Sequence, residues 1–403
     1  MSSEEHFNFR EIVSLNIKAL HIFGYFRPDT DSKLQRMLYE IYSIFAVGLL
    51  LFVLTLSEVA NMYVIFGDFE QMIADSFLSM SHWIHYVKLY VLRGRGDVIW
   101  KLIHDIERRE YLPKSPTQLR ILETNVRNSK IIFKTFFSMC IMCGICFTLI
   151  PFLGAGPGDV GKKKLPYGGW YPESYFVASY IYQIFASPLT GLGNISIDTF
   201  ITSMIMVASS QLEMLNDSVK NLKQFAMEKA AKNGRNLEEE MNLCLIECVK
   251  QHQYILDYTK TLNKVFTECI FGQFLFSVII ICFTLFKIAL VPITDVQFLT
   301  LILYLMCMLL EIFLWCYYGN EIIIHSNELT NSAYFTHWAG CSKRFGKNLV
   351  YFMTRSQLTL KMFAGGFFTL SLQTFVTILR SSWSYFAVLN HMNIVKEEMG
   401  PLM

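Results

Sequence analysis

Residues 265–291 read VFTECIFGQFLFSVIIICFTLFKIALV, and this stretch decides the fold class. Its only charged residues are Glu268 and Lys287. A helix needs about 20 mostly apolar residues to cross a bilayer, so this stretch is long enough. Of the 403 residues in the chain, 53% are hydrophobic, which is too many for an ordinary soluble protein. Working outward, we find six further candidate spans: 38–60, 69–92, 131–153, 173–210, 296–319 and 363–392.

We therefore predict an all-α protein with seven transmembrane helices. Two of the spans are less regular than the others. Span 69–92 is interrupted by Asp75, Lys88 and two histidines. Span 173–210 is long and contains Asp198, so we expect it to bend or to extend beyond the membrane.

The basic residues lie mostly on one side of these spans. Of the 35 Lys and Arg residues, 27 fall in the N-terminal tail and in the loops after spans two, four and six. The opposite connections hold only Lys162, Lys163, Lys164 and Lys396. By the positive-inside rule, this asymmetry predicts a cytoplasmic N-terminus and an extracellular C-terminus. A G-protein-coupled receptor, the alternative class of seven-helix receptor, would have its N-terminus outside.

The alternation of apolar spans and charged connections divides the chain into six segments. Apolar residues at Met241, Leu245 and Val249 mark a helix with one buried stripe below the membrane. We predict that this part packs with the segment after span six as a cytoplasmic anchor. The predicted segments are an N-terminal segment 1–36, helices one to four in 37–210, a helical extension 211–264, helices five and six in 265–319, an anchor segment 320–362, and helix seven with a short tail in 363–403.

The sequence favours a protein that is not an enzyme. A rival class with inverted seven-helix topology is the zinc hydrolase that resembles adiponectin receptors. His82 and His85 form an HxxH pair, but His325, His337 and His391 are predicted at other depths, whereas zinc ligands must converge on one point. No phosphate-binding glycine loop or GxSxG nucleophile motif is present. We expect no metal, no other cofactor and no nucleic-acid partner.

Three charged residues fall near the middle of predicted spans. These are Asp198, Glu311 and Arg380. Because charges at this depth are costly, they either pair with one another or face water. One prediction is therefore a pair between Arg380 and Glu311 or between Arg380 and Asp198. The other is that span seven borders an aqueous vestibule.

Span seven is rich in hydroxyl side chains for a membrane helix. Thr369, Ser371, Thr374 and Thr377 are followed by a further run of serines, and the helix becomes apolar near its end. A polar helix that narrows to an apolar ring is typical of an ion pore closed by dewetting. Hydrogen bonding between helices is the alternative explanation.

Four motifs resemble those of one known family. They are LHIFGY at 20–25, CYYGN at 316–320, FAGGFF at 363–368 and ILRSSWSYF at 378–386. They resemble the insect odorant receptors, and topology and length agree over the whole chain. The resemblance implies an odorant-gated, non-selective cation channel that works without G proteins. In this family four subunits surround a pore lined by the outer part of span seven.

The resemblance also implies particular site residues. The pore and gate positions would be Ser384, Tyr385, Val388, His391 and Met392, with Val388 and Met392 one turn apart at the gate. The ligand would be a volatile in a small apolar pocket in the outer half of the bundle. Its predicted lining is Ile73, Ser76, Phe77, Met80, Cys143, Phe147, Ile150, Tyr180, Ile184, Phe298 and Ile302.

Two departures narrow the subtype. Related gustatory receptors end in a Tyr followed by a Gln-Phe pair, whereas Tyr385 here leads to Asn390, His391 and Met392. The shared odorant co-receptor has a much longer loop than 211–264. The chain therefore resembles a ligand-tuned subunit that forms a heterotetramer with the co-receptor. We expect it in the plasma membrane of olfactory sensory neuron dendrites, in contact with lipid.

Overall fold

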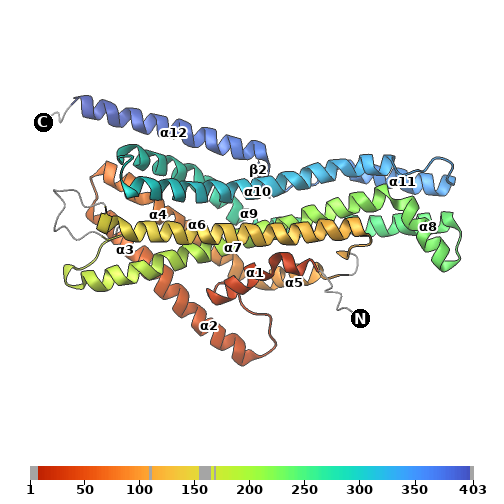
Figure 1. Cartoon of the computed structure of the whole chain (residues 1–403), viewed down its shortest axis with the longest axis horizontal. Coiled ribbons are helices and arrows are strands. Elements are labelled where there is room, and N and C mark those ends of the chain that lie inside the picture. Colours follow the sequence, from red (N-terminus) through yellow and green to blue (C-terminus); the bar gives the residue numbers. More distant parts are fainter. Residues whose placement is uncertain (1–7, 109–110, 154–164, 168, 400–403) are drawn as a thin grey trace.

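The computed structural model describes residues 8–108, 111–153, 165–167 and 169–399. It is an elongated bundle of helices with one small hairpin (Figure 1). Its elements, in chain order, are α1 (Arg10–Ile22), α2 (Lys33–Val47), a π-helical turn (Gly48–Phe52), α3 (Val53–Val64), α4 (Phe69–Gly94), α5 (Gly96–Asp105), α6 (Pro116–Leu153), a short 3₁₀ turn (Glu173–Tyr175), α7 (Phe176–Lys220), α8 (Leu222–Asn233), α9 (Leu237–Leu290), α10 (Val296–Tyr334), α11 (Lys343–Ser356), β1 (Phe363–Ala364), β2 (Phe368–Thr369) and α12 (Leu372–Met399).

Five helical segments of the described chain are long and apolar enough to cross a membrane. They correspond to predicted spans one and three to six: Lys33–Val64, Pro116–Leu149, Phe176–Lys220, Leu237–Leu290 and Val296–Tyr334. The two more polar candidates, α4 and α12, complete the seven. Charged and hydroxyl side chains lower their hydropathy, as the sequence pattern indicates.

Helix α7 lies at the centre of the bundle. It packs against α1, α6, α9 and α10, and most of its side chains are buried. It is one helix of 45 residues despite Pro188, and α9 continues without a break for 54 residues. The segment 211–264 is therefore helical almost throughout, as its apolar stripe predicts. The helices α8 and α11 cluster at one end of the molecule (Figure 1).

Local sequence signals fix where several helices begin. The side chains of Asp68 and Asp295 accept hydrogen bonds from backbone N–H groups in the first turns of α4 and α10. Ser115 does the same for α6, and Pro116 takes the first helical position, where the missing N–H costs nothing. These caps determine where three helices begin, and all three helices surround the site described below.

Helix seven begins later than the hydropathy predicts. Residues 363–369 form a two-stranded antiparallel hairpin, and α12 begins only at Leu372. Gly365 and Gly366 both have positive φ, 59° and 78°, and the Phe367 N–H donates to the Ala364 carbonyl. Two successive left-handed residues make a tight turn that favours glycine over residues with a Cβ atom. The boundary at 363 was wrong because this apolar run contains a turn.

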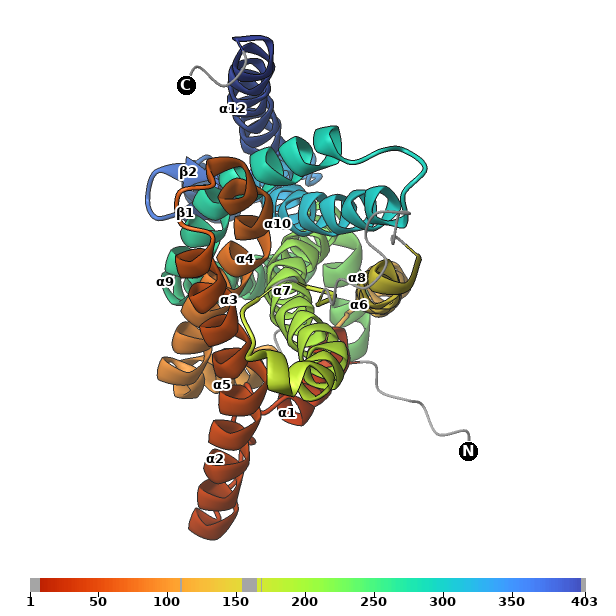
Figure 2. The same cartoon turned by 90° about the vertical axis from the view of Figure 1, so that its left-hand side faces the viewer.

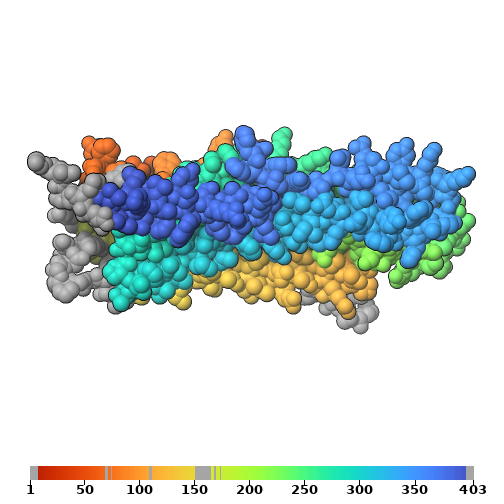
Figure 3. Space-filling model, turned by 90° about the horizontal axis from the view of Figure 1, so that it is seen from above, coloured from red at the N-terminus to blue at the C-terminus, as the bar shows by residue number. Residues whose placement is uncertain are grey.

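Two helices extend away from the bundle on opposite sides, α2 and α12 (Figure 2). Seen from above in Figure 3, α12 lies along the outer surface of the single chain. It packs mainly against α9 and α10, and its buried residues Ile378 and Ser382 lie one turn apart on one face. Most of its other side chains are therefore exposed in the single chain.

Candidate functional site

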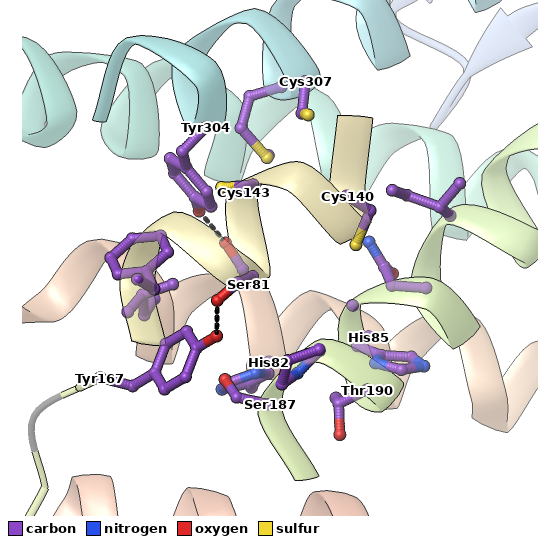
Figure 4. Close-up of a pocket in the computed structure, with 18 of the residues that line it drawn as sticks. Ser81, His82, His85, Cys140, Cys143, Tyr167, Ser187, Thr190, Tyr304 and Cys307 are labelled. Carbon is purple, nitrogen blue, oxygen red and sulfur yellow. Dashed lines mark hydrogen bonds between the residues drawn. The ribbon is translucent and has the colours of Figure 1, made fainter. Parts of the chain in front are cut away.

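A cavity of about 120 Å³ lies between α4, α6, α7 and α10 (Figure 4). Its walls are mostly apolar, and its size is close to that of an engineered cavity of about 150 Å³ that holds one benzene molecule. The lining residues are Leu78, Ser81, His82, His85, Phe136, Cys140, Cys143, Gly144, Phe147, Tyr167, Ser187, Pro188, Thr190, Gly191, Asn194, Ile195, Tyr304, Cys307, Met308 and Glu311.

Two tyrosines close one side of the cavity. Tyr167 comes from the segment between α6 and α7, and its hydroxyl donates to the Gly144 carbonyl at 3.1 Å. Its ring packs against Phe147 with the ring centroids 5.0 Å apart. Tyr304 of α10 shares a hydrogen bond with Ser81 of α4 (Figure 4). These contacts fix the wall through hydrogen bonds that tie neighbouring elements together.

Two lining residues of the cavity, Asn194 and Glu311, belong to a buried charged cluster. Lys88 is fully buried, and its ammonium lies 2.5 Å from Asp198 Oδ1 and 2.8 Å from Glu311 Oε1. It also donates to Asn194 Oδ1 at 3.2 Å and stands 5.6 Å from the centre of the Trp315 ring. A buried charge needs such partners, because desolvation costs several kcal/mol per ion. One lysine thus joins α4, α7 and α10.

The predicted pairing of Arg380 was therefore wrong. Asp198 and Glu311 are both paired with Lys88, while Arg380 is exposed on α12. Lys88 lies in the polar span 69–92, and a helix rotation that turns it inward brings it to both carboxylates. The alternative, in which Arg380 faces water, stays open.

The HxxH pair of α4 does not form a metal centre. His82 Nδ1 lies 3.0 Å from Glu58 Oε2, and both side chains are buried. His85 lines the cavity with 1% of its surface exposed. Within the described residues, no group of three or more His, Cys, Asp or Glu side chains is placed to hold a metal ion.

A sequence model described as "7tm Odorant receptor" matches residues 68–383, which is most of the chain. The chain belongs to the insect odorant receptor family. The family consists of receptors, not enzymes, and this receptor shares its seven-helix fold.

Similar proteins support this assignment. The receptor is 29% identical to odorant receptor 94a of Drosophila melanogaster over 55% of each chain. It is 28% identical to odorant receptor Or1 of Anopheles gambiae, over 61% of this chain and 64% of the relative. The matched part thus spans between about half and two thirds of these relatives. Odorant receptor 2a of Drosophila melanogaster matches at 24% identity over 96% of this chain and 99% of its own.

The fold matches that of a solved receptor. The olfactory receptor OR5 of Machilis hrabei, solved in complex with eugenol, superposes with a TM-score of 0.81 at 17% identity. The match covers 95% of this chain and 98% of that one. The structure of the same receptor reported without a named ligand gives a TM-score of 0.79. At this identity the similarity establishes the fold alone.

Only some of the predicted ligand residues of this receptor line the cavity. Cys143 and Phe147 line it. Phe77 packs edge-on against Tyr304 with the ring centroids 5.1 Å apart, and Ile73 is buried on the same helix. Neither Ile73 nor Phe77 lines the cavity itself. The same holds for Ser76, Met80, Tyr180, Ile184, Phe298 and Ile302, while the side chain of Ile150 lies outside the described part. Their role in binding stays a prediction.

The predicted pore residues share the exposed face of α12. Ser384, Tyr385 and His391 are exposed, and Val388 and Met392 expose 56% and 59% of their surface. The structure thus brings these five side chains together on one helix. It leaves them without close packing in the single chain.

Sequence reasoning missed the charged cluster beside the cavity and its tyrosine wall. Lys88 was singled out only as an interruption of a span, and His85 only as that and as half of the HxxH pair. They lie three residues apart on α4, so periodicity places them on one face of that helix. Tyr167 carries no such signal, because it lies in a loop.

Filling the cavity is expected to block the response to ligand. Cys143→Phe replaces a thiol with a phenyl ring at the wall of a space of about 120 Å³. We expect the half-maximal concentration for any activating odorant to rise at least tenfold, measured as the cellular response at matched surface expression. Ile145→Phe is the control, because Ile145 is on the exposed face of the same helix. Equal responses from the two variants would show that ligand binds elsewhere.

Proposed function

We propose that this chain is the odorant-binding subunit of a heteromeric, ligand-gated, non-selective cation channel. One observation carries the proposal: α10 lies between the cavity and α12. Tyr304 and Met308 face the cavity, whereas Leu305 and Leu309 line a groove against Leu379 and Trp383 of α12. A ligand that repositions α10 would therefore also act on α12.

The ligand in this proposal is a small, mainly apolar volatile. The cavity excludes large molecules by its size, and its cysteine, phenylalanine and methionine side chains favour apolar contact. The solved relative is described in complex with eugenol, which is a small aromatic volatile. Ligand binding would stabilise one arrangement of the bundle over another, and this population shift would open the pore.

Helix α12 would line the pore. Thr377, Ser381, Ser384, Val388 and His391 recur at intervals of three and four residues, which places them on one stripe. The stripe is polar except at Val388, which lies one turn before Met392. In a single chain much of this stripe is exposed, and a partner subunit or the ion path would cover it.

Replacing the apolar side chains of the proposed gate by smaller ones tests the pore assignment. Val388→Ala or Met392→Ala widens the constriction, so we expect a higher resting current, because a wider apolar ring is wetted more easily. The measurement is whole-cell current without odorant, with the co-receptor coexpressed.

Val376→Ala is the control for this test, because Val376 is exposed on the same helix four residues after its start at Leu372. Its resting current should equal that of the unchanged receptor. If Val388→Ala and Met392→Ala also leave resting current and ion preference unchanged, α12 of this subunit does not form the gate.

The proposed partner is the odorant co-receptor, in a heterotetramer that conducts cations. The cytoplasmic anchor of this subunit would be formed by the segments 211–264 and 320–362, which contain α8 and α11. The segments 37–210, 265–319 and 363–403 would form the membrane part, with 1–36 inside the cell. We propose the plasma membrane of olfactory sensory neuron dendrites as the location.

The proposed orientation places the N-terminus in the cytoplasm. An epitope tag at residue 1 is expected to be stained only after cells are permeabilised, whereas a tag at residue 403 should be stained on intact cells. The reverse pattern would fit a receptor of the G-protein-coupled type and would contradict the proposal.

A further inference from the structure

His85 is a buried polar side chain whose hydrogen-bonding groups are not satisfied. It exposes 1% of its surface, and neither Nδ1 nor Nε2 has a hydrogen-bond partner among the described residues. The ring lines the cavity beside Thr190 (Figure 4). Leaving a buried donor or acceptor without a partner costs about 1–3 kcal/mol, so this residue is poised to gain from a polar ligand.

The surroundings of His85 do not supply this partner. The Tyr25 ring packs edge-on against it at 5.1 Å between centroids, and the Tyr25 hydroxyl is also buried without a partner among the described residues. His82, one turn away, is paired with Glu58. Lys88, on the next turn, is held by Asp198 and Glu311. Among the described residues none hydrogen-bonds to the imidazole, and the ring borders the cavity.

Charge decides which polar group the cavity accepts. Next to His85, one buried lysine is shared by two carboxylates. Carboxylate odorants are disfavoured, because this cluster contains more acidic than basic groups and Glu311 itself lines the cavity. In its neutral form an imidazole ring offers one donor and one acceptor. A hydroxyl group matches either of them.

We propose that the cavity selects small alcohols or phenols, whose hydroxyl group hydrogen-bonds to His85 while the apolar body packs against Phe136, Phe147 and Met308. This inference rests on the proposed function and specifies its ligand class. His85 is the residue that would set the preference for a hydroxyl group. The cysteine and aromatic side chains would set only the size and shape of the body.

Pairs of compounds that differ only in hydroxyl against methyl test the assignment. Phenol is compared with toluene, and benzyl alcohol with ethylbenzene. The full chain is coexpressed with the co-receptor, and half-maximal concentrations are measured from evoked currents. We expect each hydroxyl compound to be at least tenfold more potent than its methyl partner, which corresponds to about 1.4 kcal/mol.

Variants of His85 separate a direct contact from a structural effect. In His85→Phe the hydroxyl preference is expected to fall below about threefold, with toluene as potent as before or more so. His85→Gln keeps a donor and an acceptor, so it should keep much of the preference. Trp83→Phe, on the exposed face of the same helix, should keep all of it.

Other outcomes would overturn the assignment. Equal potency within each pair in the unchanged receptor would do so. A preference that survives in His85→Phe would also do so. A stronger response to benzylamine than to benzyl alcohol would show that Glu311, and not His85, selects the ligand.

Binding is measured separately from gating. The purified complex of the full chain with the co-receptor is melted with and without each compound, since a ligand that binds the folded state raises its stability. A higher melting temperature with alcohols but no current would contradict the proposed channel function alone. No shift and no current with any hydroxyl compound would overturn the ligand class.

Discussion

Replacing Lys88 by methionine is expected to abolish accumulation of the folded receptor. Asp198 and Glu311, both buried, would lose their shared cation. Removing one partner of a buried ion pair destabilises a protein by about 3–5 kcal/mol. Because proteins are stable by only about 5–15 kcal/mol, this is a large fraction of the total. The measurements are surface abundance by antibody staining and the melting temperature of the detergent-purified protein.

The same substitution at an exposed pair provides the control. Lys229 lies 2.6 Å from Glu247 on the surface, and an exposed pair contributes at most about 1 kcal/mol, so Lys229→Met should melt close to the unchanged receptor. Neutralising the two acids in Lys88→Met, with Asp198→Asn and Glu311→Gln, should restore part of the loss. If Lys88→Met melts like the unchanged protein, the charge cluster does not hold these helices together.

Gly319→Ala is expected to displace the hairpin that precedes α12. A Cβ atom at residue 319 would lie 2.4 Å from the Leu370 Cβ and 2.7 Å from the Leu370 carbonyl oxygen, closer than such atoms approach. Leu370 is buried, and its N–H donates to the Met362 carbonyl, so it has little room to move. Overpacking of this kind costs about 1–3 kcal/mol.

The expected result is a lower melting temperature and a larger loss of odorant-evoked current than of surface protein, because α12 begins two residues after Leu370. Gly346→Ala is the matched control, since a Cβ atom there meets nothing within 4 Å. It lies inside α11, where alanine is the better helix former, so the control should melt at the same temperature or slightly higher. Equal currents from both variants would argue against close packing at Gly319.

Most of the fold follows from the sequence, because the membrane imposes a simple rule on helix length. Apolar stretches of the required length predict five helices directly. Span seven was also predicted as an apolar stretch, although its hydroxyl side chains make α12 more polar than those five helices. The hairpin was missed because FAGGFF is apolar enough to continue a helix, although two adjacent glycines are a turn signal.

The site is less predictable, because periodicity gives the face of a helix but not the depth of a cavity along it. On α4 the predicted residue Phe77 is followed on the same face by Ser81 and His85, which line the cavity one and two turns further on. The depth depends on where Tyr167 closes the space. The partner of Asp198 depends on how α4 is rotated, and a single sequence does not encode that rotation in any local pattern.

Because α7 is one continuous helix, a tilt near the cavity displaces its far end. Asp198, clamped by Lys88 beside the cavity, lies 22 residues before Lys220 at the end of the same helix. At 1.5 Å per residue this part is about 33 Å long. A tilt of about 3° around Asp198 would therefore move Lys220 by about 2 Å. A small change in how the cavity is filled would thus produce a larger displacement at the far end of α7.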